Sequence, residues 1–192
     1  MSAMATLFRN GEGVSKDLEK ALNWETKAAM AGYIPSMFAV GMAHSKGQGT
    51  AADMAKAFFW FHKSAENGDT DGMLKVAYWY RNGIGTREDD RKARRWYEHA
   101  SEIGETTAML NIAAMLYNGE GGERDPHAAA SYLFTAVDQG SDLVLSNLTG
   151  PNSWFGFEVI EALQWELTDR GLYSGEVDGE MGPQTITALE AL

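Results

Sequence analysis

The sequence predicts an all-α protein, in which an α-solenoid of helix-hairpin repeats is followed by a small helical module. Glycine pairs recur every 36 residues through most of the chain, which is the signature of stacked repeats. The last 36 residues leave that register and show a turn pattern of their own. The chain of 192 residues is 44% hydrophobic and 22% charged, as expected for a globular protein of one large or two small domains.

The repeat is carried by several columns of residues, each advancing in steps of 36 without an insertion. The glycine pairs are GEG, GQG, GIG and GEG, beginning at Gly11, Gly47, Gly83 and Gly119. The same register holds an acidic, a small, an aromatic and a second glycine column: Asp17, Asp53, Asp89 and Asp125; Ala21, Ala57, Ala93 and Ala129; Trp24, Trp60, Trp96 and Tyr132; Gly32, Gly68, Gly104 and Gly140.

Each unit reads as an antiparallel pair of helices. One helix fits between Gly32 and Gly47 and a second between Gly49 and Gly68, with glycine supplying the left-handed residue that commonly ends a helix. The Asp column lies just ahead of the second helix, where a carboxylate can cap free N–H groups. One such pair cannot bury both of its faces, so the units are expected to stack.

These columns resemble the Sel1-like repeat, a relative of the tetratricopeptide repeat. Residues 11–32, GEGVSKDLEKALNWETKAAMAG, and residues 47–68, GQGTAADMAKAFFWFHKSAENG, match its pattern well. The aromatic position before the glycine pair varies, being Phe8, His44, Tyr80 and Leu116. The resemblance covers residues 1–140 and implies a right-handed α-solenoid that binds a protein partner.

The register also predicts the two ends of the solenoid. Residues 141–149 read as the first helix of a fifth unit that caps the solenoid, so we expect a solenoid over 1–149 and a linker over 150–156. Met1 falls inside the first helix of the first repeat, which would leave an uncovered apolar face there. We therefore expect this sequence to be a piece of a longer protein, with any targeting signal upstream.

Residues 157–192 predict a compact module with two or three helices. Ile160, Leu163 and Leu167 share one helical face, and Gly171 ends that helix. Two turns follow, and Pro183 occupies the favoured first position of another helix. The core of such a module is small, so packing on the end of the solenoid would stabilise it.

The module resembles the small helical peptidoglycan-binding domain of bacterial envelope proteins. The match runs over Ile160, Leu163, Gln164, Leu167, Gly171, Tyr173, Gly175, Val177, Asp178, Gly179, Gly182, Pro183, Thr185, Ala188 and Leu189. It implies peptidoglycan as a partner, with Gln164, Tyr173, Asp178 and Thr185 as candidate binding residues. The alternatives are that Asp178 caps a turn and that Tyr173 packs in the core. Eight acidic residues against Arg170 alone predict weak, hydrogen-bonded association rather than electrostatic attraction.

In the solenoid, large residues that break the repeat pattern are the candidates for a partner groove. They are Tyr78, Trp79, Arg81 and Tyr117, since a cluster with aromatic anchors can act as an interaction hot spot. The alternative for Trp79 is that it fills the core between repeats. The recurring Trp column is expected to be core.

Several function classes are disfavoured by the sequence. The net charge of −11 opposes nucleic-acid binding, and the basic run at 91–95 reads as a solvated helix face. No apolar run is long enough to span a membrane. There are no cysteines, the four histidines lack metal-ligand spacing, and no catalytic motif is present, so we expect no cofactor and no metal.

Together, the two resemblances imply a non-catalytic scaffold of the bacterial envelope, located in the periplasm. Its expected partners are peptidoglycan and an unidentified envelope or polarity protein, and the domain order resembles the periplasmic end of polar localisation factors of alphaproteobacteria. The alternative is a regulatory adaptor whose degenerate peptidoglycan-binding module acts as a structural cap. A wall-turnover enzyme would require a catalytic domain upstream of Met1.

Overall fold

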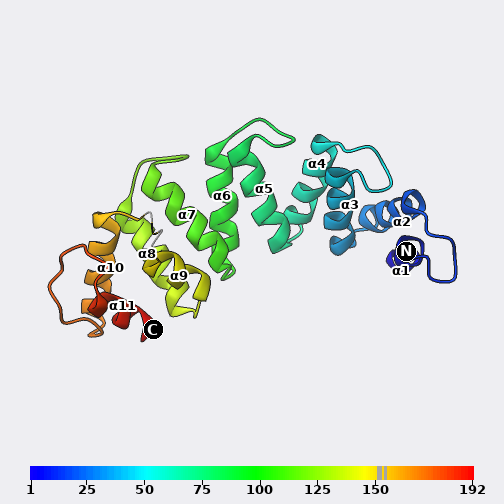
Figure 1. Ribbon diagram of the computed structural model, residues 1–192. Helices are drawn as coiled ribbons and strands as arrows, with labels where there is room; N and C mark the ends of the chain where they lie inside the picture. Colours follow the sequence, from blue (N-terminus) through cyan, green and yellow to red (C-terminus); the bar gives the residue numbers. More distant parts are fainter. Residues whose placement is uncertain (151–152, 154) are drawn as a thin grey trace. The chain divides into compact units, whose positions relative to one another are not determined.

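The computed structural model describes residues 1–150, 153 and 155–192, and these form eleven α-helices without a strand (Figure 1). The chain divides into two compact units, Met1–Trp96 and Tyr97–Leu192. The predicted all-α solenoid is therefore confirmed as an all-helical fold. The boundary between the units falls inside one helix, α6 (Asp90–Glu102).

The first unit is a succession of helices of similar length. They are α1 (Ser2–Asn10), α2 (Leu18–Met30), α3 (Ile34–Lys46), α4 (Met54–Glu66) and α5 (Thr70–Asn82), followed by the first turns of α6. Each of the helices α1 to α4 packs against the helix that follows it in the chain. The glycines at the corners, Gly11, Gly47 and Gly83, adopt the left-handed conformation predicted for helix ends.

The second unit holds the fourth repeat and the C-terminal module. Its helices are α7 (Thr106–Asn118), α8 (Pro126–Asp138), α9 (Asp142–Thr149), α10 (Phe157–Asp169) and α11 (Pro183–Glu190). The predicted helix at 141–149 forms as α9, but the main partners of α8 are α7 and α10, and α9 touches it only slightly. The reason is length: α9 is 8 residues long and buries two side chains, whereas α10 is 13 residues long and buries six.

The Asp column caps helices as predicted. Asp17, Asp53 and Asp125 are the N-cap residues of α2, α4 and α8, and each accepts the N–H of the third residue after it. Asp89 accepts the N–H of Lys92 at 3.0 Å in the same way. These backbone N–H groups hold the pKa of Asp17, Asp53 and Asp89 below the ordinary value, because they stabilise the charged carboxylate.

The second glycine of each pair has a different role from the first. Gly49 and Gly85 have φ of +77° and +66°, and a β-carbon on them would lie 2.2 Å and 2.1 Å from the carbonyl oxygens of Leu18 and Met54. Leu18 and Met54 are the first residues of α2 and α4. The loop of one repeat therefore rests directly on the start of a helix in the repeat before it.

The Trp column differs from its expected place in the core. Trp24, Trp60, Trp96 and Tyr132 are only partly buried, whereas Ala21, Ala57, Ala93 and Ala129 of the small column are buried. The Lys27 ammonium group lies 4.7 Å from the centre of the Trp24 ring. The large rings thus cover the rim of the helix contacts, while alanine allows the backbones to approach.

The column of Phe8, His44, Tyr80 and Leu116 before the glycine pairs contains one ring that titrates near neutral pH. Lys20 lies over the Phe8 ring at 5.6 Å, and Lys92 lies over the Tyr80 ring at 5.2 Å. In the second repeat this ring is His44, whose Nδ1 atom is buried without a hydrogen-bond partner. Burial and the nearby Lys56 charge lower the pKa of His44.

We expect His44 to make the protein less stable as the pH falls. Because its folded-state pKa lies below the unfolded value, the unfolded chain takes up the proton first as the pH drops through about 6.5. Wild-type stability should fall below that pH and level off once the folded-state pKa is passed. Urea unfolding at pH 8 and pH 5.5 should show a smaller loss for His44→Phe than for wild type. Equal losses would contradict the assignment.

Candidate interaction sites

The structure places the four residues predicted to form a partner groove in different surroundings. Trp79 is buried in the first unit, where its ring lies 5.1 Å from Phe61, edge to face, and 6.4 Å from Phe58, stacked. It fills the core between repeats, so its predicted role as an accessible groove residue is corrected. Tyr78 is 50% exposed, and Arg81, three residues later on α5, shares its helical face.

Tyr117 lies in the second unit and is also engaged within the fold. The Arg124 guanidinium carbon lies 5.0 Å from the centre of its ring, and Phe155 packs against it at 6.2 Å. A β-carbon on Gly156 would lie 2.5 Å from the Tyr117 hydroxyl. Tyr117 therefore contacts the segment leading into the C-terminal module, and because its side chain is only partly buried, its place in a partner groove stays a prediction.

In the C-terminal module, Gln164 is fully buried at the centre of a hydrogen-bond network. Its Oε1 accepts the N–H groups of Asp178 at 3.0 Å and Gly179 at 2.8 Å. Its Nε2 lies 2.8 Å from Asp178 Oδ1, 3.0 Å from the Glu180 carbonyl oxygen and 3.1 Å from Thr185 Oγ1. One side chain on α10 thus holds the whole loop that leads to α11, which corrects its predicted contact with a ligand.

The other three candidate residues lie around this network. Asp178 is exposed and also accepts the Glu180 N–H at 2.9 Å, so it caps the turn. The Gln164 amide and then the Glu180 N–H keep the pKa of the Asp178 carboxyl below its ordinary value. Tyr173 is 8% exposed, and its hydroxyl donates to the Glu176 carbonyl oxygen at 2.7 Å. Thr185 is 1% exposed.

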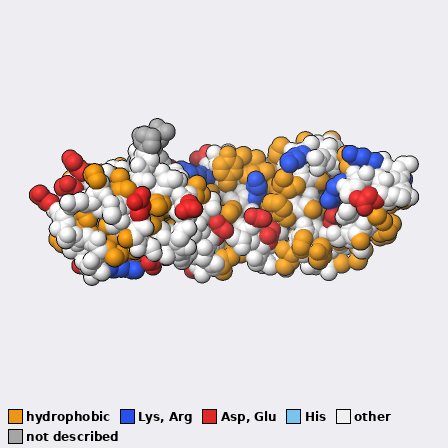
Figure 2. Space-filling view, turned by 60° about the horizontal axis from the view of Figure 1, so that its bottom comes forward, with side chains coloured by type: hydrophobic (Ala, Val, Ile, Leu, Met, Phe, Trp, Pro, Cys, Tyr) orange, Lys and Arg blue, Asp and Glu red, His pale blue; other side chains and the backbone are white. Residues whose placement is uncertain are grey.

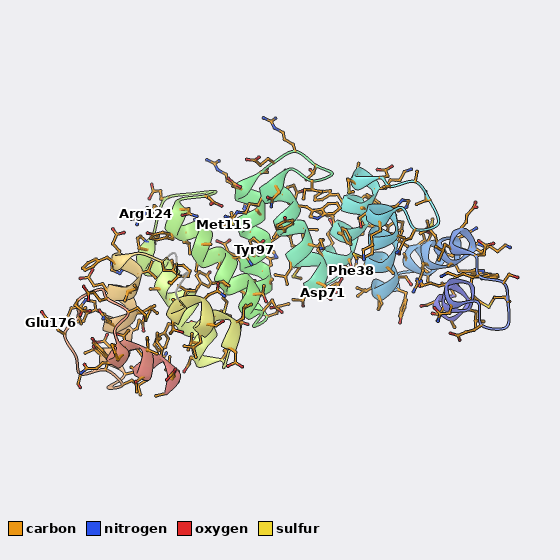
Figure 3. All side chains as sticks on the ribbon, in the orientation of Figure 1. Phe38, Asp71, Tyr97, Met115, Arg124 and Glu176 are labelled. Atoms are coloured by element: carbon orange, nitrogen blue, oxygen red, sulfur yellow. The ribbon has the colours of Figure 1, made fainter. Side chains whose placement is uncertain are left out.

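A hollow of about 520 Å³ nevertheless opens beside these residues. Tyr173, Asp178 and Thr185 line it together with Glu176 and Glu180. Figure 3 shows Glu176 on the loop between α10 and α11, and Figure 2 shows acidic side chains gathered at this end of the second unit. A second hollow of about 350 Å³ lies against α11, and exposed Gln184 lines both.

Sequence reasoning missed Gln184 because it sits at a variable position of the module's pattern. The fixed positions of that pattern are the ones that build the fold, as Gln164 and Thr185 show by their burial. The signal that could have found Gln184 is its place in the first turn of the predicted helix that begins at Pro183, where a long polar side chain faces the preceding loop.

The module contacts the fourth repeat through Arg124 and Arg170, which are the only Lys or Arg residues in the sequence of 97–192. Arg124, in the loop before α8, pairs with Glu158 on α10, and its Nη1 lies 3.2 Å from Glu158 Oε1. Arg170, at the end of α10, lies 3.4 Å from Asp138 Oδ2 at the end of α8. Its guanidinium also lies over the Phe134 ring at 4.3 Å.

We expect the contact between Arg124 and Glu158 to depend on their opposite charges. Each group shifts the pKa of the other toward the charged form, Arg124 upward and Glu158 downward. Arg124→Glu should raise amide hydrogen exchange in α10, and adding Glu158→Arg should restore the protection at low salt. Because both side chains are largely exposed, molar NaCl should reduce the difference. Failure of the swap to restore protection would contradict the pairing.

Within the described part of the chain, no helix is both long and apolar enough to cross a membrane. No group of three or more His, Asp or Glu side chains among the same residues is placed to hold a metal ion.

Comparison with known proteins gives a family and a fold. A family model described as the Sel1 repeat matches residues 1–33, 34–69, 70–105 and 106–141. No curated protein matches the chain. The crystal structure of a Sel1 repeat protein from Oxalobacter formigenes is 26% identical, with a TM-score of 0.72, covering 98% of this chain and 83% of that one.

Two further structures support the same architecture. The protective antigen c5321 of uropathogenic Escherichia coli, which displays an SLR fold, is 26% identical with a TM-score of 0.69. The match covers 96% of this chain and 43% of the antigen. Cysteine-rich protein B of Helicobacter pylori is 23% identical with a TM-score of 0.51, covers 70% of this chain and 97% of its own, and is similar in fold alone. The matched repeat segments end at residue 141, before α10 and α11.

Proposed function

This chain belongs to the Sel1 repeat family, whose members are generally non-catalytic scaffolds for protein–protein interaction, and from that premise we propose that it binds a protein partner through its repeats while its C-terminal module closes the last of them. The partner would be an envelope or polarity protein. Tyr78 and Arg81 on α5 are the residues of the predicted groove that best fit this role, because Tyr78 is exposed and Arg81 shares its face.

The observation that carries the cap role of the C-terminal module is the packing of α10 on α8. A solenoid needs its last helix pair covered, because that pair has no following repeat. Here α10 lies against α8 with six buried side chains, and Arg124 and Arg170 tie its two ends to the fourth repeat. This favours the cap role that the sequence left as the alternative for the module.

A charge change on the exposed face of α5 tests the scaffold role. Partner proteins that cross-link to the wild type in the native cell can be identified by mass spectrometry. These partners should no longer be recovered with the double variant Tyr78→Glu and Arg81→Glu. They should be retained with Lys16→Glu, a charge reversal at an exposed site far from α5 along the sequence, in the first repeat. If all three proteins recover the same cross-linked partners, α5 does not carry the interaction.

We also propose, as a second function, that the module associates weakly with peptidoglycan. The support is the module's sequence pattern and the hollow of about 520 Å³, which three of the four predicted residues line. Exposed Gln184 offers an amide that a sugar–peptide polymer can use, and the largely buried Tyr173 ring lines the same hollow. The protein would then act in the periplasm, in envelope organisation or polar localisation.

Sedimentation with purified sacculi tests this second function without disturbing the buried network. Wild type should co-sediment, Gln184→Trp should lose binding because it fills the hollow, and Ser131→Trp on the exposed face of α8 should bind as wild type does. Absence of wild-type binding, or full binding by Gln184→Trp, would leave the module as a structural cap only.

A further inference from the structure

The first unit contains a half-open hollow of about 200 Å³ between α1, α2 and α3. Leu22 and Ala43 contribute apolar walls, and Met42 lies beside them. Arg9 and Glu25 form a polar side, where Arg9 Nη2 donates to Glu25 Oε1 at 2.9 Å. Among the residues that the structure describes, no side chain fills this space.

The 36-residue register shows what would fill it. Adding 36 to Glu25 and Ala43 gives Phe61 and Trp79, which lie at the same place one repeat further along. There the two rings pack edge to face at 5.1 Å and both are buried. The first column runs Glu25, Phe61, Tyr97 and Leu133, and the second runs Leu7, Ala43, Trp79 and Met115. Each column lacks a large apolar side chain at one position only, Glu25 in the first and Ala43 in the second, and these two residues line the hollow.

On the polar side of the hollow, the Glu25 carboxylate is held in place by hydrogen bonds. Glu25 is 5% exposed, and its second oxygen accepts the hydroxyl of buried Ser36. A buried carboxylate is costly unless it is paired, and each oxygen can accept more than one hydrogen bond. Glu25 can therefore accept one further N–H from a group that enters the hollow.

We propose that this hollow binds the indole ring of a tryptophan in the partner polypeptide, with the indole N–H donating to Glu25. The ring would take the place that Trp79 takes in the next repeat. The size is suitable, since an engineered apolar cavity of about 150 Å³ in another protein binds benzene. A tryptophan seated in a preformed pocket is a typical hot spot of a protein interface. The inference rests on the proposed scaffold function and names the chemistry of the partner.

N-acetyl-tryptophanamide is the probe that tests the hollow directly. Titration into the full chain, followed by the methyl signals of Met42 and Leu22 in NMR, should give saturable shifts. Ala43→Trp, which copies the next repeat, should weaken binding at least tenfold, whereas Ala55→Trp at an exposed site on α4 should bind as wild type does. N-acetyl-leucinamide should shift these signals far less.

Two further measurements keep the test decisive. Ala39→Phe fills the same hollow from a different position if Ala43→Trp does not fold, and 1-methyl-tryptophan amide tests the N–H contact with Glu25. No saturable shift with the wild type, or equal binding by the filled and wild-type proteins, overturns the proposal. Because the probe is a small molecule, that failure leaves partner binding at α5 untouched.

Discussion

Gln164→Leu is expected to cost about 3 to 5 kcal/mol and to unfold the loop between α10 and α11. Leucine fills a similar volume but leaves the N–H groups of Asp178 and Gly179 without an acceptor. The Glu180 carbonyl and Thr185 hydroxyl lose a donor at the same time. Buried polar groups without partners are among the few causes of such a large loss from one substitution.

Urea unfolding and amide exchange at Asp178 and Gly179 measure this loss. Gln184→Leu is the matched control, because it changes an exposed glutamine of the same module and should alter stability by less than about 0.5 kcal/mol. Gln164→Glu should be partly rescued by acid, since protonation restores a donor beside Asp178. Equal stability of Gln164→Leu and Gln184→Leu would contradict the role given to the buried amide.

Gly85→Ala is expected to cost about 2 to 5 kcal/mol, although it adds a single methyl group. Two causes combine. The residue has a φ of +66°, and its β-carbon would lie 2.1 Å from the carbonyl oxygen of Met54, which is backbone and cannot move aside cheaply. The loop would have to lift away from the start of α4.

Gly13→Ala separates these two causes. Gly13 has a φ of +73°, but a β-carbon there would meet nothing within 4 Å, so only the conformational cost of about 1 to 2 kcal/mol should remain. Gly49→Ala, with Leu18 at 2.2 Å, should behave as Gly85→Ala does. Denaturant midpoints for the three variants give the comparison. A cost for Gly85→Ala no larger than for Gly13→Ala would exclude the contact between repeats as a source of stability.

The repeat architecture was readable from the sequence because its signals are local. Glycines at positive φ and N-cap aspartates act within one turn of chain, and the 36-residue spacing repeats them four times. The place of Trp79 was not readable, because its burial depends on Phe61 in the neighbouring repeat. Column identity alone does not distinguish a ring that fills a core from one that faces a partner.

The C-terminal module was predicted as a pattern but not as a set of contacts. The amide of Gln164 and the place of Thr185 at a turn suggest ligand contact, yet polar residues at such places also hold loops together, and burial decides between the two roles. The packing of α10 on α8 could not be derived from register either. It depends on which helix offers the larger apolar face, and the short helix α9 buries fewer side chains than α10.

Native-state hydrogen exchange in α8 is the most direct test of the proposed cap. The amides of Leu133, Phe134 and Val137 belong to buried residues of α8, within the unit that α10 completes. In the full chain carrying Gln164→Leu, the account predicts that these amides lose protection together with those of α10. Wild-type protection in α8 alongside a loosened α10 would contradict it, and the module would then be a separate domain rather than the cap of the solenoid.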